Sequence, residues 1–131
     1  MRPGRELDTM IAQHVFGHEV VIKRKLPTEV TPLGERPLRE YSKEIGAAFD
    51  VAKKLNISLI PIDGGQWFAL KGGNEGFKSP AEFIQYLSEG NFINAGAAVT
   101  ESAPLSICLA AMKFVEVKLA QERIDQDQPN Q

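Results

Sequence analysis

The chain has 131 residues, of which 43% are hydrophobic and 24% are charged, and its formal net charge is −2. These values are ordinary for one globular domain with a single core, and they exclude an intrinsically disordered chain. The small negative charge gives no general attraction to nucleic acid, and no apolar run approaches the roughly 20 residues of a membrane-spanning helix.

Residues 3–16 predict an amphipathic helix, because apolar residues recur there every three or four positions and Gly17 can end the helix. The β-branched residues 20–22 favour a short strand. Between residues 25 and 40, three prolines remove backbone donors and favour turns, so we expect a loop or an edge segment.

A second helix is predicted to begin after Ser42, whose hydroxyl can accept a hydrogen bond from an amide of the first turn. Its predicted apolar face consists of Ile45, Ala48, Phe49, Ala52 and Leu55. Residues 57–62 and 66–70 flank an Asp-Gly-Gly turn and predict a β-hairpin. Pro61 indicates that the first strand of this hairpin lies at an edge.

Ser79 and Pro80 predict the start of a short helix that ends at about Gly90, because serine caps a helix and proline fits its first turn. The alternation along residues 92–99 predicts a third strand. Thr100 and Ser102 then offer capping hydroxyls to a long, largely buried last helix, and residues 125–131 have nothing to pack against.

We therefore expect an α+β fold in which helices sandwich a small antiparallel sheet and the last helix is long. The hairpin and the third strand form this sheet, with residues 20–22 as a candidate fourth strand. Residues 1–124 are expected to form one domain, and residues 125–131 a disordered tail. The single cysteine, Cys108, cannot form an intramolecular disulfide, and no apolar run follows a basic start, so we expect a cytoplasmic protein without a secretory signal.

Two segments carry a family resemblance. Residues 41–51 read Tyr-Ser-Lys-Glu-Ile-Gly-Ala-Ala-Phe-Asp-Val, and residues 97–113 contain the helix start Ala-Pro-Leu-Ser-Ile-Cys. Together with a weaker match at residues 10–17, they resemble the phage ABA sandwich family of small phage and prophage proteins. The resemblance implies a sheet between helices, a phage origin and therefore a location in the bacterial host cytoplasm. It brings no catalytic residues.

The chain also departs from that family pattern. His18 stands where a tryptophan is usual, and residues 72–90 look like an insertion. Function is often carried by loops and added elements, so the insertion is where we expect a role particular to this protein.

His14 and His18 have the four-residue spacing of a zinc-binding helix face. Val15 stands where a metalloprotease has glutamate, however, and Gly17 is expected to end the helix before His18. We therefore predict no metal site. Cys108 lies between Ile107 and Leu109 and is expected to pack in the core.

Glycines that precede a helix, with lysines beside them, can hold an anion at the amides of the helix start. The spacing of a P-loop is absent, and an ordinary turn that ends in a cap is the alternative interpretation. The candidate ligand-binding residues are Lys71, Gly72, Gly73, Asn74, Lys78 and Ser79.

Several aromatic residues surround the hairpin and the insertion, and they are candidates either for the core or for an interface. The candidate interface residues are Trp67, Phe77, Tyr86 and Phe92. The basic residues 23–25 have glutamates nearby in the sequence, which favours a solvated surface over a nucleic-acid site.

The sequence favours a non-catalytic, phage-encoded accessory binding protein that forms homo-oligomers and needs no cofactor. Its partner would be a host protein or a small anionic ligand such as a phosphorylated molecule or a nucleotide. Two other classes stay open: a small hydrolase-type enzyme whose residues assemble from distant positions, and a structural component of the virion.

Overall fold

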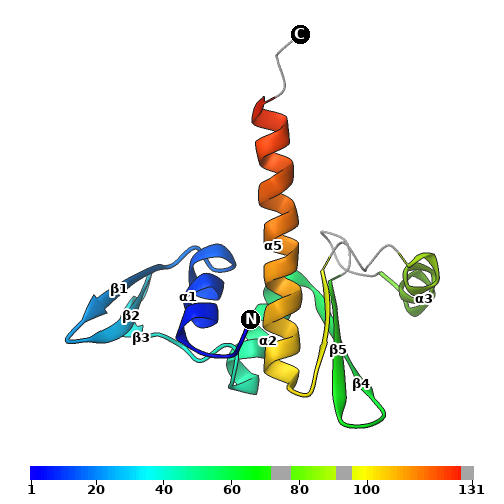
Figure 1. Ribbon diagram of the computed structural model, residues 1–131, viewed down its shortest axis with the longest axis horizontal. Helices are drawn as coiled ribbons and strands as arrows, with labels where there is room; N and C mark the ends of the chain where they lie inside the picture. The colour runs from blue at the N-terminus through cyan, green and yellow to red at the C-terminus, as the bar shows by residue number, and fades with distance from the viewer. Residues whose placement is uncertain (72–77, 91–95, 128–131) are drawn as a thin grey trace.

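The computed structural model describes residues 1–71, 78–90 and 96–127, and within them the chain forms four helices and two three-stranded antiparallel sheets. This confirms the α+β class and the long C-terminal helix (Figure 1). In chain order the elements are α1 (Arg5–His14), β1 (Glu19–Lys23), β2 (Leu26–Thr31), β3 (Gly34–Pro37), α2 (Ile45–Leu55), β4 (Ile57–Ile62), β5 (Gln66–Lys71), α3 (Pro80–Glu89), β6 (Ala97–Thr100) and α5 (Ala103–Asp127).

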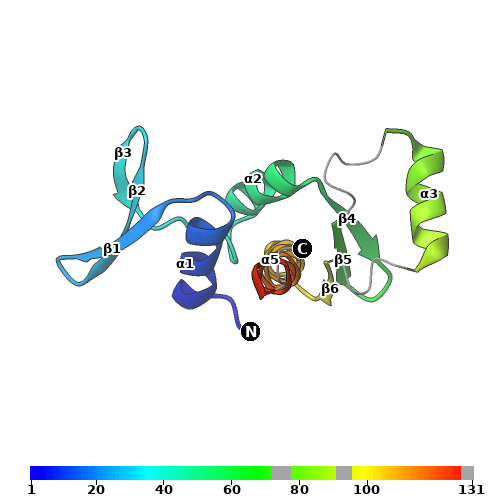
Figure 2. The ribbon, with the colours of Figure 1, turned by 90° about the horizontal axis from the view of Figure 1, so that it is seen from above.

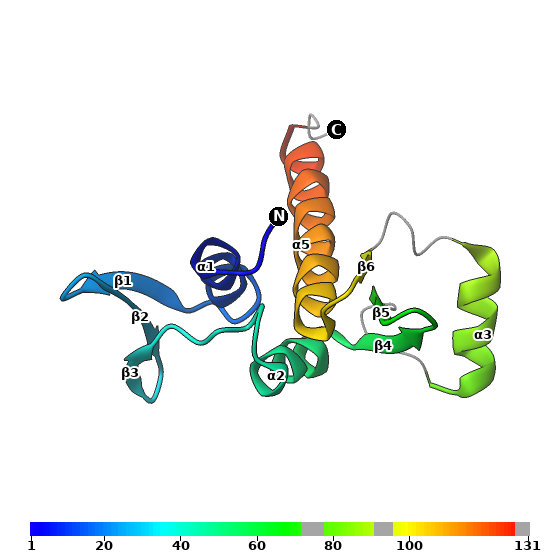
Figure 3. The same cartoon turned by 60° about the horizontal axis from the view of Figure 1, so that its bottom comes forward.

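Helix α5 is the centre of the molecule. Seen along its axis, α1 and the sheet β1–β3 lie on one side and the sheet β4–β6 lies on the other, with α3 beyond it (Figure 2). Helix α2 packs across the base of α5 (Figure 3). The core is closed by fully buried side chains from α1, α2, β5 and α5, among them Leu7, Ile11, Ala48, Val51, Ala69, Ile107, Cys108 and Ala111.

The sheet β4–β6 contains the predicted hairpin and third strand, although residues 92–95 of that predicted strand lie outside the described residues. Strands β4 and β5 form the expected hairpin, and its turn uses Gly64 and Gly65 at φ of 92° and 80°, a region that glycine enters without strain. The strand order β4-β5-β6 places Pro61 on an edge strand, as expected. Gly96, immediately before β6, approaches α5 so closely that a Cβ atom on it would lie 2.9 Å from the carbonyl oxygen of Ala110.

The N-terminal strand differs from the prediction. Strand β1 does not join the sheet of the hairpin but pairs with β2, which pairs with β3, so residues 26–37 form strands where a loop or edge segment was expected. The three prolines do not prevent these strands, because each stands where a missing backbone N–H donor is tolerated. Pro27 is the second residue of β2, Pro32 lies in the turn before β3, and Pro37 ends β3.

Ser42 also has a different role from the predicted one. Helix α2 begins after Glu44, which provides no side-chain cap. The amide and the hydroxyl of Ser42 instead donate to the buried Asp8 carboxylate at 2.8 Å and 2.7 Å, and the hydroxyl accepts from the amide of Gly4 at 2.9 Å. Ser42 therefore joins the chain before α2 to the start of α1.

Helix α5 begins as predicted and ends later. The hydroxyl of Ser102 accepts from the amide of Leu105 at 3.3 Å, and the hydroxyl of Thr100 accepts from the amide of Ser102 at 3.0 Å. The helix continues to Asp127, so residues 125–127 of the predicted tail are helical, and residues 128–131 lie outside the described residues. The side chains of Gln121 and Asp125 hydrogen-bond one turn apart at 3.2 Å, which supports this extension.

A buried carboxylate fixes the sheet β1–β3 to the rest of the molecule. Glu29 on β2 has no exposed surface, and its carboxylate accepts from the phenol of Tyr41 at 2.6 Å, from the guanidinium of Arg36 at 3.2 Å and from the amide of Arg39 at 3.3 Å. The imidazole of His18 pairs with the same carboxylate. The partners come from the segment before β1, from β3 and from the segment before α2, so one carboxylate holds all three together.

The rings around this carboxylate are stacked. Phe16 lies between His18 and Tyr41, with ring centroids 5.8 Å and 5.4 Å away. Arg39 covers the Tyr41 ring at 5.4 Å and pairs with Asp50 on α2 at 2.7 Å. Burial on its own would raise the pKa of the Glu29 carboxyl, but its hydrogen bonds, above all the one from Tyr41, hold that pKa below its usual value.

We expect Glu29→Ala to lower the free energy of unfolding by about 3–5 kcal/mol, because it leaves buried donors without their acceptor. The matched control is Glu35→Ala, which removes the exposed ion pair with Lys23 and should cost about 0–1 kcal/mol. Urea unfolding followed by circular dichroism measures both changes. Equal losses in the two variants would contradict this role of Glu29.

The stabilisation by Glu29 should also depend on pH. Because its folded pKa is below the usual 4.5, the ionised carboxylate stabilises the fold above that value and loses this effect as the pH falls through the folded pKa. The difference in unfolding free energy between the wild type and Glu29→Gln should therefore be largest near neutral pH and shrink on acidification below pH 4.5. If this difference in unfolding free energy grew on acidification, the predicted role of the ionised Glu29 carboxylate would be wrong.

Candidate functional site: a groove between α2, β4 and α3

An open groove of about 1070 Å³ lies between α2, the edge strand β4 and the start of α3. The residues from α2 and its C-cap recur at helical spacing, which places them along one face of the helix. The described residues that line the groove are Phe49, Ala52, Lys53, Asn56, Ile57, Ser58, Leu59, Ile60, Lys78, Ser79, Pro80 and Phe83.

Local sequence signals set the two ends of this groove. Asn56 ends α2 in the left-handed conformation at φ 57°, and the chain then turns directly into β4. Ser79 caps α3 as predicted, because its hydroxyl accepts from the amide of Glu82 at 3.2 Å, and Pro80 opens the first turn. The positive end of the α3 dipole therefore lies at the groove.

The charges along the groove have one sign. Lys53 from α2 and Lys78 before α3 both line it, and none of its described lining residues is acidic. Phe49, which is 49% exposed, and Phe83 add aromatic surface. The arrangement suits an anionic ligand that also carries an apolar or planar group.

The groove contains two of the six predicted ligand-binding residues, Lys78 and Ser79. Lys71 is buried on β5 and is not among the lining residues, and its ammonium lies 4.6 Å from the centroid of the Phe114 ring. Burial lowers the pKa of Lys71. The predicted residues Gly72, Gly73 and Asn74 lie outside the described residues.

Sequence reasoning missed the contribution of α2. Phe49 belongs to the predicted apolar face of this helix, yet it is 49% exposed at the groove, and Lys53 is not among the predicted ligand-binding residues. The repeat Phe49, Ala52, Lys53, Asn56 was a usable signal. It could not be interpreted alone, because the other wall comes from more than 20 positions further along the chain.

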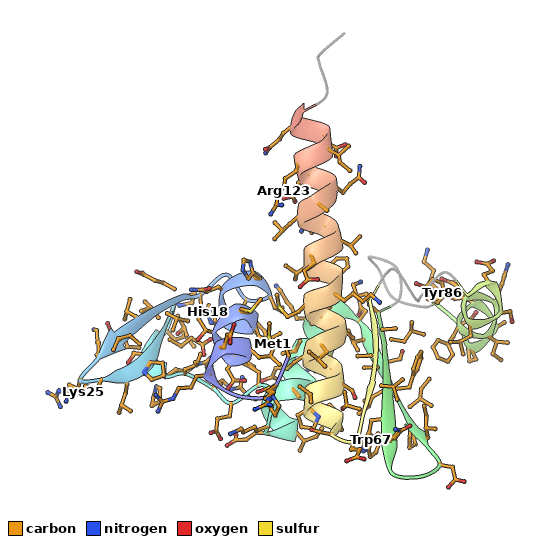
Figure 4. All side chains as sticks on the ribbon, viewed as in Figure 1. Met1, His18, Lys25, Trp67, Tyr86 and Arg123 are labelled. Atoms are coloured by element: carbon orange, nitrogen blue, oxygen red, sulfur yellow. The ribbon has the colours of Figure 1, made fainter. Side chains whose placement is uncertain are left out.

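Two of the predicted interface aromatics, Trp67 and Tyr86, are described, and they take part in internal hydrogen bonds through the Trp67 backbone and the Tyr86 hydroxyl. The carbonyl of Trp67 accepts from the hydroxyl of Ser106 at 2.8 Å, and the hydroxyl of Tyr86 donates to the carbonyl of Lys71 at 3.3 Å. Tyr86 thus joins α3 to the end of β5 (Figure 4). Phe77 and Phe92 lie outside the described residues.

The two histidines do not share a helix face. His14 ends α1 and is exposed, whereas His18 follows Gly17, which has a φ of 70°, and pairs with Glu29. Among the residues that the structure describes, no three His, Cys, Asp or Glu side chains gather in a group that could hold a metal ion.

None of the described helices combines the length and the apolar character that a membrane span requires.

The fold is similar to that of a phage protein from Bacillus cereus ATCC 14579, known from a crystal structure at 2.0 Å. The TM-score is 0.59 with 22% sequence identity, over 88% of this chain and 89% of that chain. At this identity the likeness shows the fold alone. No family model and no curated protein matches the chain, so membership of the phage ABA sandwich family stays a prediction.

Cys108 has no exposed surface and lies on the face of α5 that packs in the core. Burial, with a smaller effect from Asp8, raises the pKa of its thiol to about 12. The thiol is therefore protonated at neutral pH and is a poor nucleophile.

We expect Cys108 to resist alkylation by iodoacetamide in the native protein and to react once the chain is unfolded in urea. Mass spectrometry of time points under both conditions measures the two rates, and the native rate should be at least about 100-fold lower, because access requires unfolding. Rapid native labelling would show that the thiol is accessible.

Proposed function

We propose that this chain is a non-catalytic, phage-encoded accessory protein and that the groove between α2, β4 and α3 binds a phosphorylated small molecule, specifically a nucleotide. The similarity in fold to a phage protein supports the phage origin. One observation carries the ligand class: two lysines, two phenylalanines and the start of α3 lie along a single groove.

In the proposed complex the phosphate lies between Lys53 and Lys78, at the positive end of α3. The helix dipole and the two ammonium groups favour a negative charge there. Phe49 and Phe83 supply the aromatic surface against which a base can pack, and the strand β4 provides backbone and Ser58 as further polar groups. The volume of about 1070 Å³ is slightly above the usual range of about 300–1,000 Å³ for small-molecule sites, so the groove has room for a nucleotide.

A binding role without catalysis is consistent with how the reactive side chains are used. Cys108 is buried and protonated, and His18 is paired with Glu29. A nucleotide ligand also fits the expected location in the host cytoplasm. We therefore propose that the protein sequesters its ligand without changing it.

Nucleotides, including cyclic dinucleotides, should raise the melting temperature of the protein, because a ligand that binds only the folded state stabilises it. At 100-fold excess over the dissociation constant the stabilisation is about 2.7 kcal/mol. Thermal-shift screening and calorimetry measure it, and chromatography of the recovered ligand should show it unchanged. The corresponding nucleosides, which lack phosphate, should have no effect.

The residues of the groove can be tested with one matched set of variants. Lys53→Glu and Lys78→Glu should each weaken nucleotide binding by at least about tenfold, because each reverses a charge beside the phosphate. Lys54→Glu changes the net charge equally on an exposed neighbour that does not line the groove, and should bind like the wild type. The proposal fails if no nucleotide raises the melting temperature, or if all three variants lose affinity equally.

A further inference from the structure

Helix α5 carries two apolar stripes on opposite sides. Met112, Val115 and Leu119 face the body of the molecule, where they are buried or packed against the core. Val117 and Ile124 are 46% and 52% exposed, and together with the exposed Ala120 they form a second stripe that faces solvent. We call Val117, Ala120 and Ile124 the outer stripe.

The outer stripe lies on the part of α5 that extends beyond the rest of the molecule (Figures 1 and 4). From Glu116 to Gln126, Leu119 is the one described side chain that is half-buried, and the others are exposed. A helix of about three turns is marginal in water when nothing packs against it. The spacing of three and then four residues in the outer stripe is that of the a and d positions in a coiled coil.

The charges beside the stripe favour a particular partner. Glu116 and Arg123 occupy equivalent flanking positions seven residues apart, immediately before Val117 and before Ile124. They are two helical turns, or about 10 Å, apart along the helix, so they do not pair within one chain. An antiparallel second copy brings each beside its opposite, Glu116 against Arg123 of the other copy and the reverse. A parallel copy instead places Glu116 beside the uncharged Gln121.

We propose that the protein forms a homodimer in which the outer stripes of two α5 helices pack antiparallel, with two symmetric ion pairs between Glu116 and Arg123. In this alignment Val117 packs against Ala120 of the other copy, and Ile124 covers the aliphatic part of the half-buried Lys113. Because the contact is confined to the last few turns of each helix, we expect the dimer to be reversible.

The proposal is tested by exchanging the two charges and measuring the monomer–dimer equilibrium of the full chain by sedimentation equilibrium. Glu116→Arg and Arg123→Glu should each raise the dissociation constant by about tenfold, because each turns two attractions into repulsions. The double variant should return to the wild-type value, since it restores both ion pairs in exchanged order.

The matched control is Glu122→Arg, which makes the same chemical change on the helix face opposite the outer stripe and should leave the equilibrium unchanged. Circular dichroism of each variant establishes that it is folded. A wild-type chain that stays monomeric throughout the micromolar range, or a dimer that the double variant does not restore, overturns the proposal. The outer stripe shares no residue with the groove, so loss of dimerisation and loss of nucleotide binding are distinguishable.

Discussion

The buried carboxylate of Glu29 is the charge on which the N-terminal half of the structure depends. Removing a carboxylate from water costs several kcal/mol unless donors surround it. Here the donors come from the segment before β1, from β3 and from the segment before α2. Tyr41 gives one of them, and its neighbour Ser42 satisfies the second buried carboxylate, Asp8. The Tyr-Ser pair therefore contacts both buried acids, which gives these two residues a structural role in the fold.

The residues around Glu29 are connected to the candidate site through α2 and α5. Arg39 covers the ring of Tyr41 and pairs with Asp50 on α2, so the residues around Glu29 also position α2. Helix α2 packs on α5, and Asn56 turns the chain directly from α2 into β4. One wall of the groove and its floor are thus fixed by the core, whereas α3 completes it from the far side of the sheet and is tied to β5 by Tyr86.

The sequence predicted those elements whose signals are local. The Asp-Gly-Gly turn, the cap at Ser79 and the buried face around Cys108 each depend on a few neighbouring residues, and each was confirmed. Predictions failed where a local signal had a distant competitor. Ser42 had the form of a helix cap but bonds to Asp8, 34 residues earlier, and the prolines of residues 25–40 mark the ends of strands that the sequence pattern concealed.

By itself, the sequence determined the α+β class, the β4–β5 hairpin, the core face of α5 and two residues of the groove, because periodicity and capping are properties of a single segment. Only the tertiary structure decided that β1 belongs to a separate sheet and that Glu29 is buried. It also decided that Lys53 and Lys78 line the same groove, whereas Lys71 is buried and does not line it. These are pairings between residues far apart in the chain, and they depend on which donors and apolar faces meet when the chain folds around α5.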